Sequence, residues 1–498
     1  MKRVSVAVSP VIAIDRGAGR PIHYQIYDGY RAAILNGNLR PAQQIPSTRA
    51  LSAELGISRI PVLEAYEQLI AEGYFEARPG SGTFVSSSLP SPEASHNRKT
   101  DAPHREKPAA RGSVSTDRAI SHRVAGLRAR DHQPWMFGSG AFSIGQLAFD
   151  HFPFRVWTRL LARHCRKVNA SSMNYGDPRG SPEFREIITA YLRTSRAVRC
   201  DPRQILVVSG SQQALDICCR ALLDPGDPVW VEDPGYNLLH SALALGGCRL
   251  APIPVDRDGL NVTAGIRECR NAKAAWVTPS HQYPLGVTMS ASRRFQLLEW
   301  ARSAGAWILE DDYDSEYRYE SMPIASLQGL DQHARVIYIG TFSKTLFPSL
   351  RLGYMVVPHD LVDQFASVRR AMDVCPPPLY QAVLTDFVRE GHYARHLRKM
   401  QVLYAERRTV LVESIRKEFG SRVDISGDAA GMHLTVIATE DSWNDQEIAE
   451  RAASQKIWIS PLSIAYRGEN RKQGFILGFG STPSAEIPEA IRRIASLC

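Results

Sequence analysis

Short apolar segments alternate with longer amphipathic segments over most of the chain, from residue 135 to the C-terminus. The apolar segments are rich in β-branched and aromatic residues and are bounded by turn residues: QILVVSG, PVWVED, AAWVTP, AWILEDD and VIYIGTFS. Strands separated by helices in this way form a mostly parallel sheet that is covered on both faces. The pattern predicts an α/β fold for residues 135–498.

A different pattern comes first, over residues 47–85. The segment STRALSAEL has helical spacing, with Ser47 as a candidate N-cap and Gly56 as a stop. A second helix follows after a three-residue turn, with Ser58 as its candidate cap. One face of that helix carries Val62, Tyr66, Leu69 and Gly73. The segment YFEARPGSGTFV then predicts two short strands around a glycine-rich tip.

This order of elements is typical of a module that reads DNA. The second helix of such a pair lies in the major groove, and a hairpin tip with small side chains can approach the phosphate backbone closely. The face opposite the apolar one carries Arg59, Glu64 and Gln68. The alternative interpretation is a small helical oligomerisation domain with a hairpin.

The net charge of +9 is concentrated at the front of the chain. Residues 1–85 carry nine Lys/Arg against seven Asp/Glu, and residues 87–134 carry nine against five. The second segment is rich in Ser, Pro and Ala and poor in large apolar residues, which predicts a flexible basic linker. We therefore expect a DNA-binding domain at 18–86, the linker at 87–134 and the α/β domain at 135–498, with double-stranded DNA as the partner of the basic front.

The composition, with 44% hydrophobic and 22% charged residues, is that of a soluble globular protein. No apolar run reaches the ~20 residues that cross a membrane. The N-terminal segment MKRVSVAVSPVIAI is interrupted by Pro10 and lacks a cleavage site, so we expect a cytoplasmic protein without membrane contact. The eight cysteines form no CxxC pair and are expected to be buried, reduced thiols.

The lysine of the segment YIGTFSKTLFPSLRLGY has an informative setting. Lys344 follows a predicted strand, with hydroxyl-bearing residues on both sides and Arg351 seven residues later. A lysine that forms a Schiff base needs an uncharged amine placed against an aldehyde cofactor. A phosphate on that cofactor needs hydroxyls, backbone amides and an arginine, which Thr341, Ser343 and Arg351 supply.

A second segment fits the same chemistry. In VVSGSQQALD, Gly210, Ser211 and Gln212 begin a predicted helix directly after a strand. The N-terminus of a helix is a natural seat for a phosphate group.

A third segment, ILEDDYDSEYRY, places Asp311 and Tyr313 at the end of a buried strand. A buried carboxylate there could keep a pyridine nitrogen protonated and the ring an electron sink. The alternative, a metal site formed by Asp311, Asp312 and Asp314, lacks a histidine or further ligand at useful spacing.

Residues 21–85 resemble the winged helix-turn-helix of the GntR superfamily of bacterial transcription regulators, above all in EGYFEARPGSGTFV. The resemblance implies that the helices contact operator DNA through Arg49, Ser58 and Arg59. It implies that the wing follows the phosphates with Arg78, Gly80, Ser81 and Thr83. One departure is Pro61, which stands where the family commonly has a threonine, so that a hydroxyl contact to DNA is lost.

The chain from Phe149 onward resembles the fold-type I aminotransferases, which bind pyridoxal 5′-phosphate. The motifs follow in the family's order: YGDPRGSPEFREIITAYL, SGSQQALD, EDPGY, TPSHQYPLG, EDDYDSEYRY and SKTLFPSLRLGY. The resemblance implies that Lys344 is the Schiff-base lysine, that Asp311 pairs with the ring nitrogen and that Tyr313 bonds the ring oxygen. It places Tyr236 on the ring face. The phosphate would be held by Gly210, Ser211, Gln212, Ser343 and Arg351.

The same resemblance implies a homodimer, because the family's sites lie at a subunit interface and Tyr175 would reach the phosphate bound by the partner. Two motifs depart from the family. The asparagine of NPxNPTG is replaced in TPSHQYPLG, where His281, Gln282 or Tyr283 must take its role. The C-terminal arginine that holds a substrate carboxylate is also missing. Near its expected position stands Trp458, with Arg467 as a substitute candidate.

The two halves together resemble the MocR subfamily of GntR regulators, in which a long linker joins a winged helix-turn-helix to an aminotransferase-like domain. This resemblance implies a transcriptional regulator whose cofactor domain senses a small amine or amino acid and controls operator binding. Two alternatives stay open. Pyridoxal phosphate itself could be the sole effector, or the chain could be an active aminotransferase that retains a DNA-binding domain.

Overall fold

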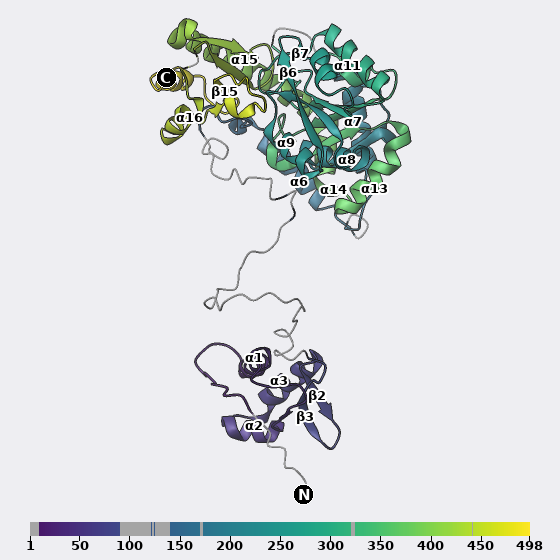
Figure 1. Ribbon diagram of the computed structural model, residues 1–498, viewed down its shortest axis with the longest axis vertical. Helices are drawn as coiled ribbons and strands as arrows, with labels where there is room; N and C mark the ends of the chain where they lie inside the picture. Colours follow the sequence, from purple (N-terminus) through teal and green to yellow (C-terminus); the bar gives the residue numbers. More distant parts are fainter. Residues whose placement is uncertain are drawn as a thin grey trace, which may run out of the picture. The chain divides into compact units, whose positions relative to one another are not determined.

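The computed structural model of the protein describes residues 9–89, 121, 124, 140–169, 173–319, 324–440 and 442–498. The chain forms two compact units, one within residues 1–117 and one within residues 118–498 (Figure 1). Most of the linker expected at 87–134 lies outside the described residues, so the domain boundaries remain predictions.

The N-terminal unit has the predicted helix pair and hairpin. Its described elements are α1 (Ile22–Leu35), β1 (Gln44–Ile45), α2 (Thr48–Leu55), α3 (Arg59–Ala71), β2 (Phe75–Arg78) and β3 (Gly82–Val85). The strands form an antiparallel sheet in the order β1-β3-β2. In the core, Tyr30, Tyr66 and Phe75 meet edge to face, which ties α1 and α3 to β2.

Capping residues set the limits of the helix pair. The Ser47 hydroxyl accepts a hydrogen bond from the Ala50 N–H at 3.2 Å, and Gly56 ends α2 at φ 62°, as predicted. Ser58 does occupy the N-cap position of α3, but its side chain makes no capping hydrogen bond. A cap accepts from the second or third N–H of a helix, and Pro61 at the third position has none.

An eight-stranded sheet forms the centre of the C-terminal unit, in the order β4-β11-β10-β9-β8-β5-β6-β7. Its strands are β4 (Ile205–Val208), β5 (Pro228–Asp233), β6 (Arg249–Asp256), β7 (Gly259–Leu260), β8 (Ala274–Val277), β9 (Trp307–Asp312), β10 (Val336–Thr341) and β11 (Gly353–Val356). Strands β10, β9, β8, β5 and β6 run parallel, whereas β11 and β7 are antiparallel to their neighbours. The expectation of a mostly parallel sheet is confirmed.

Helices cover both faces of this sheet. In β4, Ile205 and Val207 pack with α6, α7 and α14, while Leu206 and Val208 pack with α8, α9 and α13 on the opposite face. The helices are α6 (Phe154–Cys165), α7 (Pro182–Ser195), α8 (Ser211–Leu222), α9 (Asn237–Leu245), α10 (Val262–Glu268), α11 (Ala291–Ala304), α12 (Leu327–Leu330), α13 (Val362–Asp373) and α14 (Pro378–Arg389).

A smaller antiparallel sheet follows, in the order β12-β13-β15-β14. Its region contains α15 (His392–Phe419), β12 (Val423–Ser426), β13 (His433–Ala438), α16 (Asp445–Ser454), β14 (Ser460–Pro461), β15 (Gly474–Gly478) and α17 (Ile487–Ala495). The 28-residue α15 joins the two sheets, because Tyr393 packs in the core of the large sheet and Leu411 in that of the small one. Short 3-10 helices lie at Phe149–His151, Pro202–Gln204, Pro348–Leu350, His359–Leu361, Gly420–Arg422 and Ser463–Ala465.

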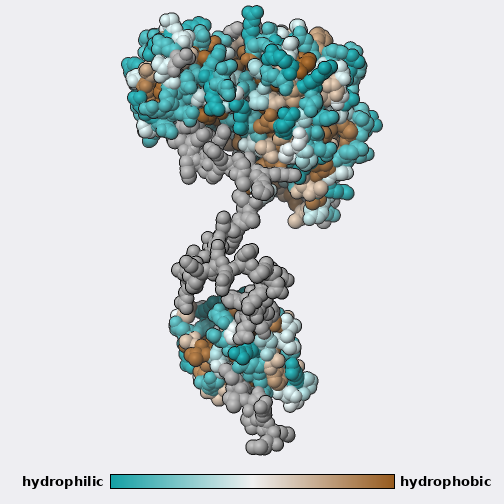
Figure 2. Space-filling model, in the orientation of Figure 1, coloured by the Kyte–Doolittle hydropathy of each residue, from teal (hydrophilic) through white to brown (hydrophobic). Residues whose placement is uncertain are grey.

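The surface carries mostly hydrophilic residues with hydrophobic ones scattered among them, on the face drawn in Figure 2. Within the described residues, no helix combines the length and the apolar character needed to cross a membrane. All eight cysteines are free thiols, as expected. Five of them are buried, but Cys165 and Cys498 are exposed and Cys375 is half-buried, so the expectation of burial was wrong for these three.

Candidate functional site

The carboxyl ends of two neighbouring strands bring Asp311 and Lys344 to one edge of the large sheet. β9 and β10 are parallel, with Asp311 opposite Ile339, and Lys344 lies in the turn that follows β10. A Cβ atom on Gly145 would lie 2.6 Å from Lys344 Nζ. The chain at Gly145 therefore passes directly over the lysine amine, and a side chain there would displace that amine.

Asp311 is a buried carboxylate with an unused oxygen. Its Oδ1 atom accepts no hydrogen bond within the described residues. Burial, followed by the charge of Asp312, raises the pKa of Asp311 to about 7. A buried acceptor without a donor costs free energy. The protonated nitrogen of a pyridine ring would supply that donor, so Asp311 fits a pyridine cofactor.

Burial also acts on the lysine amine. It lowers the pKa of Lys344 below its ordinary value, although the carboxylates of Asp314 and Asp311 oppose this shift. A larger fraction of the amine is therefore uncharged than in an exposed lysine. The uncharged amine is the form that attacks an aldehyde.

The N-terminus of α8 forms a second part of the site together with Arg351. Gly210 precedes the helix at φ 90°, and a Cβ atom there would lie 3.1 Å from Arg351 Nη2. The same guanidinium donates to the carbonyl oxygen of Ser209. A guanidinium beside the positive end of a helix dipole is repulsive unless an anion lies between them. The arrangement therefore fits a phosphate group.

The other residues expected at the phosphate lie in the first turn of α8 and in the turn after β10. Ser211 and Gln212 are the first two residues of α8, and Gln212 Oε1 is buried without a hydrogen-bond partner in the described chain. Ser343 lies in the same turn as Lys344, where its N–H donates to Thr341 Oγ1 at 3.1 Å.

Aromatic side chains complete the site. Tyr236 immediately precedes α9 and meets Tyr283 edge to face, with ring centroids 5.7 Å apart. Burial and then the charge of Asp311 raise the pKa of Tyr236 to about 12, so the phenol keeps its proton. Tyr313 Oη lies 3.1 Å from His281 Nδ1.

The segment TPSHQYPLG, where the family's asparagine is replaced, gives its three candidates different surroundings. Gln282 Nε2 donates to the carbonyl oxygens of Pro234 and Tyr283 at 2.9 and 2.6 Å, and its Oε1 accepts from Leu285 N–H. Gln282 therefore joins its own loop to the end of β5. His281 and Tyr283 remain as the candidates for the asparagine's role.

His281 belongs to a buried polar cluster. Its Nδ1 lies 3.2 Å from both carboxylate oxygens of Asp314, and its Nε2 has no partner within the described residues. The His433 ring is tilted against that of His281, with centroids 4.7 Å apart, and His433 Nε2 lies 3.1 Å from the carbonyl oxygen of Pro284. His281 and Asp314 are therefore hydrogen-bonded to each other, and His433 lies beside them. Of the three aspartates considered as metal ligands from the sequence, Asp312 is paired with Arg196 and Asp314 with His281.

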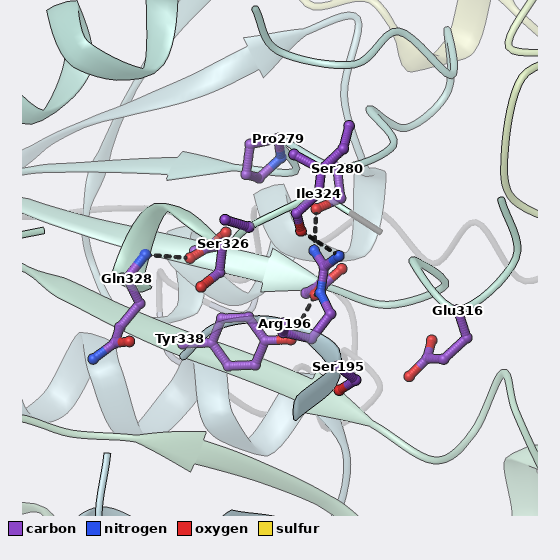
Figure 3. A network of polar contacts seen from close by, with 12 residues as sticks. Ser195, Arg196, Pro279, Ser280, Glu316, Ile324, Ser326, Gln328 and Tyr338 are labelled. Carbon is purple, nitrogen blue, oxygen red and sulfur yellow. Dashed lines mark hydrogen bonds and ion pairs between the residues drawn. The ribbon is translucent and has the colours of Figure 1, made fainter. Parts of the chain in front are cut away.

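Arg196 was not singled out from the sequence, yet it lies at the centre of a network of polar contacts (Figure 3). Its Nε lies 2.7 Å from Asp312 Oδ2, and both side chains are buried. The other guanidinium nitrogens donate to Ser280 Oγ and to the carbonyl oxygen of Ile324. Tyr338 donates its phenolic proton to the same Asp312 oxygen. Arg196 thus joins the strand of Asp311 to the loop of His281. No local pattern in YLRTSRAVRC predicts this role.

The two residues near the expected carboxylate-binding position also have structural contacts. Trp458 packs against Gly140, where a Cβ atom would lie 2.6 Å from the indole ring. Arg467 Nε donates to His240 Nδ1 at 3.0 Å, and its backbone N–H donates to Asp233.

Tyr175 is 80% exposed on the described chain. Other large apolar side chains with exposed surface are Phe154, Met173 and Tyr380.

The N-terminal unit exposes the residues expected to contact DNA. Among the described side chains, the exposed ones of this set are Arg49, Ser58, Arg59, Arg78, Gly80 and Ser81, while Thr83 is half-buried. Arg59 Nε donates to Thr48 Oγ1 at 3.0 Å, which holds the start of α3 against α2. Arg78 lies over the Phe84 ring at 4.6 Å, next to the tip of the wing.

Two family models match the chain. Residues 23–85 match "Bacterial regulatory proteins, gntR family", and residues 141–494 match "Aminotransferase class I and II". The chain is 39% identical to the "Probable rhizopine catabolism regulatory protein MocR" of Rhizobium meliloti, over 98% of this chain and 95% of that protein. It is a MocR-type regulator of the GntR family.

Other relatives of this MocR-type regulator match along nearly their whole length. The "Uncharacterized HTH-type transcriptional regulator YdeL" of Bacillus subtilis is 31% identical over 97% of both chains. The "HTH-type pyridoxine biosynthesis transcriptional regulator PdxR" of Corynebacterium glutamicum is 28% identical over 96% of this chain and 98% of that one. The protein is therefore a DNA-binding transcriptional regulator with an aminotransferase-like domain, as the sequence indicated.

Solved structures confirm the fold of the C-terminal unit. The kynurenine aminotransferase of Pyrococcus horikoshii superposes with a TM-score of 0.70 at 28% identity, covering 76% of this chain and 96% of its own. The multiple substrate aminotransferase of Thermococcus profundus gives a TM-score of 0.70 at 26% identity, covering the same shares. The fold-type I architecture implies binding of pyridoxal phosphate.

Proposed function

We propose that pyridoxal 5′-phosphate binds at the edge formed by Lys344, Asp311 and the N-terminus of α8. The observation that carries this proposal is the unpartnered Oδ1 of Asp311 beside a lysine whose pKa is lowered. The cofactor supplies an aldehyde that reacts reversibly with primary amines. Lys344 provides the covalent attachment, and Asp311 accepts a hydrogen bond from the ring nitrogen.

The remaining side chains hold the cofactor without reacting. Tyr236 packs on the ring face and Tyr313 bonds the ring oxygen, with His281 behind it at 3.1 Å. The phosphate is held by Gly210, Ser211, Gln212, Ser343 and Arg351. Tyr175 contacts the phosphate in the partner of a homodimer, in keeping with its high exposure on a single chain.

In this proposal the C-terminal unit is a sensor in a cytoplasmic regulator. An effector amine or amino acid competes with Lys344 for the cofactor aldehyde. The exchange changes the contacts around Lys344, and this change alters operator binding by the winged helix-turn-helix. The binding residues proposed there are Arg49, Ser58, Arg59, Arg78, Gly80, Ser81 and Thr83.

A second candidate is that pyridoxal phosphate itself is the effector. The relative PdxR, whose name assigns it to pyridoxine biosynthesis, favours this version. The same site residues would act, but operator affinity would change on cofactor binding alone. Comparing the operator affinities of the cofactor-free and cofactor-loaded proteins, with no amine present, separates the two versions.

The attachment to Lys344 is tested by spectroscopy. Purified protein is expected to absorb in the visible, and borohydride reduction is expected to leave the cofactor on one peptide that contains Lys344. Lys344→Ala should lose both properties. Lys417→Ala, at an exposed lysine of α15, is the matched control. A visible band of unchanged strength in Lys344→Ala would rule out this lysine.

A further inference from the structure

The first turn of α3 exposes an apolar side chain on the side of the helix turned away from its core. Ile60 is 66% exposed, whereas Val62, Tyr66 and Leu69 are buried. Because successive helical residues turn by about 100°, Ile60 points almost directly opposite this buried row. A single exposed isoleucine is ordinary on a protein surface. The place of Ile60 in the helix-turn-helix makes it informative.

Ile60 is the second residue of the second helix, and in this motif the first residues of that helix contact base edges. Exposed arginines lie before, beside and beyond it in the chain, at Arg49, Arg59 and Arg78. A guanidinium suits a phosphate oxygen, so these three provide charge complementarity to a duplex. The Ser58 hydroxyl makes no capping bond and is exposed.

The two residues that follow Arg59 in the first turn offer no side-chain hydrogen bond to a base edge. Pro61 has no N–H group and no polar atom in its side chain, and Ile60 has only carbon. One turn further, Leu63 is 42% exposed and equally apolar. An apolar side chain against the polar edge of a guanine or cytosine would remove water from it without replacing the hydrogen bond. The thymine edge is the one that presents a methyl group in the major groove.

We propose that Ile60 reads the 5-methyl group of a thymine in each half-site of the operator, with Leu63 extending the apolar contact. The inference rests on DNA binding by the winged helix-turn-helix. Acidic residues follow on the same face of α3, at Glu64 and Glu67, and Glu64 lies 3.3 Å from His23. Their charge disfavours close approach to phosphates, so the helix enters the groove by its first turn.

The test uses the full-length protein and duplexes that wild type enriches from a random DNA library. Each thymine of an enriched duplex is replaced in turn by deoxyuridine, which removes the methyl group alone. At the position read by Ile60, wild-type affinity is expected to fall about fourfold per half-site, the loss of one buried carbon. Ile60→Ala is expected to bind the thymine and deoxyuridine duplexes equally at that position.

Ile70→Ala is the matched control, because Ile70 is 39% exposed at the far end of the same helix. It should keep the wild-type sensitivity to deoxyuridine, and thermal unfolding should show that both variants are folded. The proposal is overturned if no thymine replacement weakens wild type. It is also overturned if Ile60→Ala keeps the full deoxyuridine effect, or if it loses affinity equally for enriched and random duplexes. An Ile60→Ala protein that binds DNA as wild type does would instead point to a protein contact at this surface.

Discussion

At the scale of single residues, Asp311 shows how the site is prepared for a cation. The pKa of its carboxyl is raised to about 7 from an ordinary value of 3.8, so the carboxyl keeps its proton up to nearly neutral pH. Between these values the native chain binds more protons than the unfolded chain. Its unfolding free energy therefore falls as pH rises from about 4 to about 7, and stays lower above that range. A ring-nitrogen cation opposite Oδ1 would remove this cost.

The first prediction concerns Asp311→Asn in the cofactor-free protein. The variant is expected to be more stable than wild type at pH 8 by at most ~4 kcal/mol, about three pKa units at 1.4 kcal/mol each. The gain should be much smaller at pH 4.5, where the wild-type carboxyl is protonated when folded. Cofactor affinity should fall, because the amide cannot pair with a ring-nitrogen cation. Urea unfolding at both pH values and a cofactor titration measure these effects.

Asp424→Asn, at an exposed position in β12, serves as the control for removal of one carboxylate. Equal changes in unfolding free energy at pH 4.5 and pH 8 for Asp311→Asn would contradict the assigned pKa.

At the scale of elements, β9 separates its acidic residues between its two faces. Glu310 accepts hydrogen bonds from the N–H groups of Leu327 and Gln328 at 2.8 and 2.9 Å. Asp312 is paired with Arg196, while Asp311 points to the other face and has an unused oxygen. On the rear face Arg196 balances the charge of Asp312, although Asp312 Oδ1 also has no hydrogen-bond partner within the described residues.

The second prediction tests that pair. Arg196→Met leaves Asp312 buried without its counter-charge, which should cost ~3–5 kcal/mol of unfolding free energy. The double variant Arg196→Met/Asp312→Leu should recover most of this loss, because no charge then stays buried. Asp312 also contributes to the raised pKa of Asp311. The double variant removes this charge, so the pH midpoint of the bound cofactor's absorption should shift in it.

Arg199→Met, three residues further along and exposed, is the control for loss of an arginine from this segment. Similar unfolding free energies for Arg196→Met and Arg199→Met would show that the Asp312 contact contributes little.

At the scale of the whole molecule, the proposed sensing has to link a cofactor site and a DNA-binding site that belong to separate compact units. A ligand can shift operator binding only through its different affinities for the competent and incompetent states. Such coupling is ordinarily worth ~1–3 kcal/mol, or about 5–150-fold in affinity.

The third prediction follows from this coupling. The cofactor-loaded protein is titrated with each compound of a panel of amines, amino acids and 2-oxo acids. For each compound, both the absorption spectrum and the operator affinity are measured. The compound that shifts the absorption band should change operator affinity within about 5–150-fold. Little pyridoxamine phosphate should accumulate. Without the family's carboxylate-binding arginine, a bound amino acid is poorly oriented for proton loss. Complete conversion to pyridoxamine phosphate, reversed by a 2-oxo acid and without an effect on DNA, would indicate an aminotransferase.

The local parts of this protein could be read from its sequence. The helix limits at Ser47 and Gly56 were predicted correctly, and so were the buried strands of the large sheet. The Ser58 cap failed for an equally local reason, the missing N–H of Pro61. The phosphate and Schiff-base residues were named through the family's motifs, since spacing along the chain could not show that they meet.

The sequence by itself determined the order of the elements, the alternation that buries the sheet on both faces, and the family. These depend on periodicity and capping, which act over a few residues. Only the tertiary structure decided that Arg351 lies against Gly210, that Gln282 bonds the chain at Pro234, and that Arg196 pairs with Asp312, 116 residues away. Such contacts depend on strand order and on which face each side chain takes, and neither is encoded in the neighbouring residues.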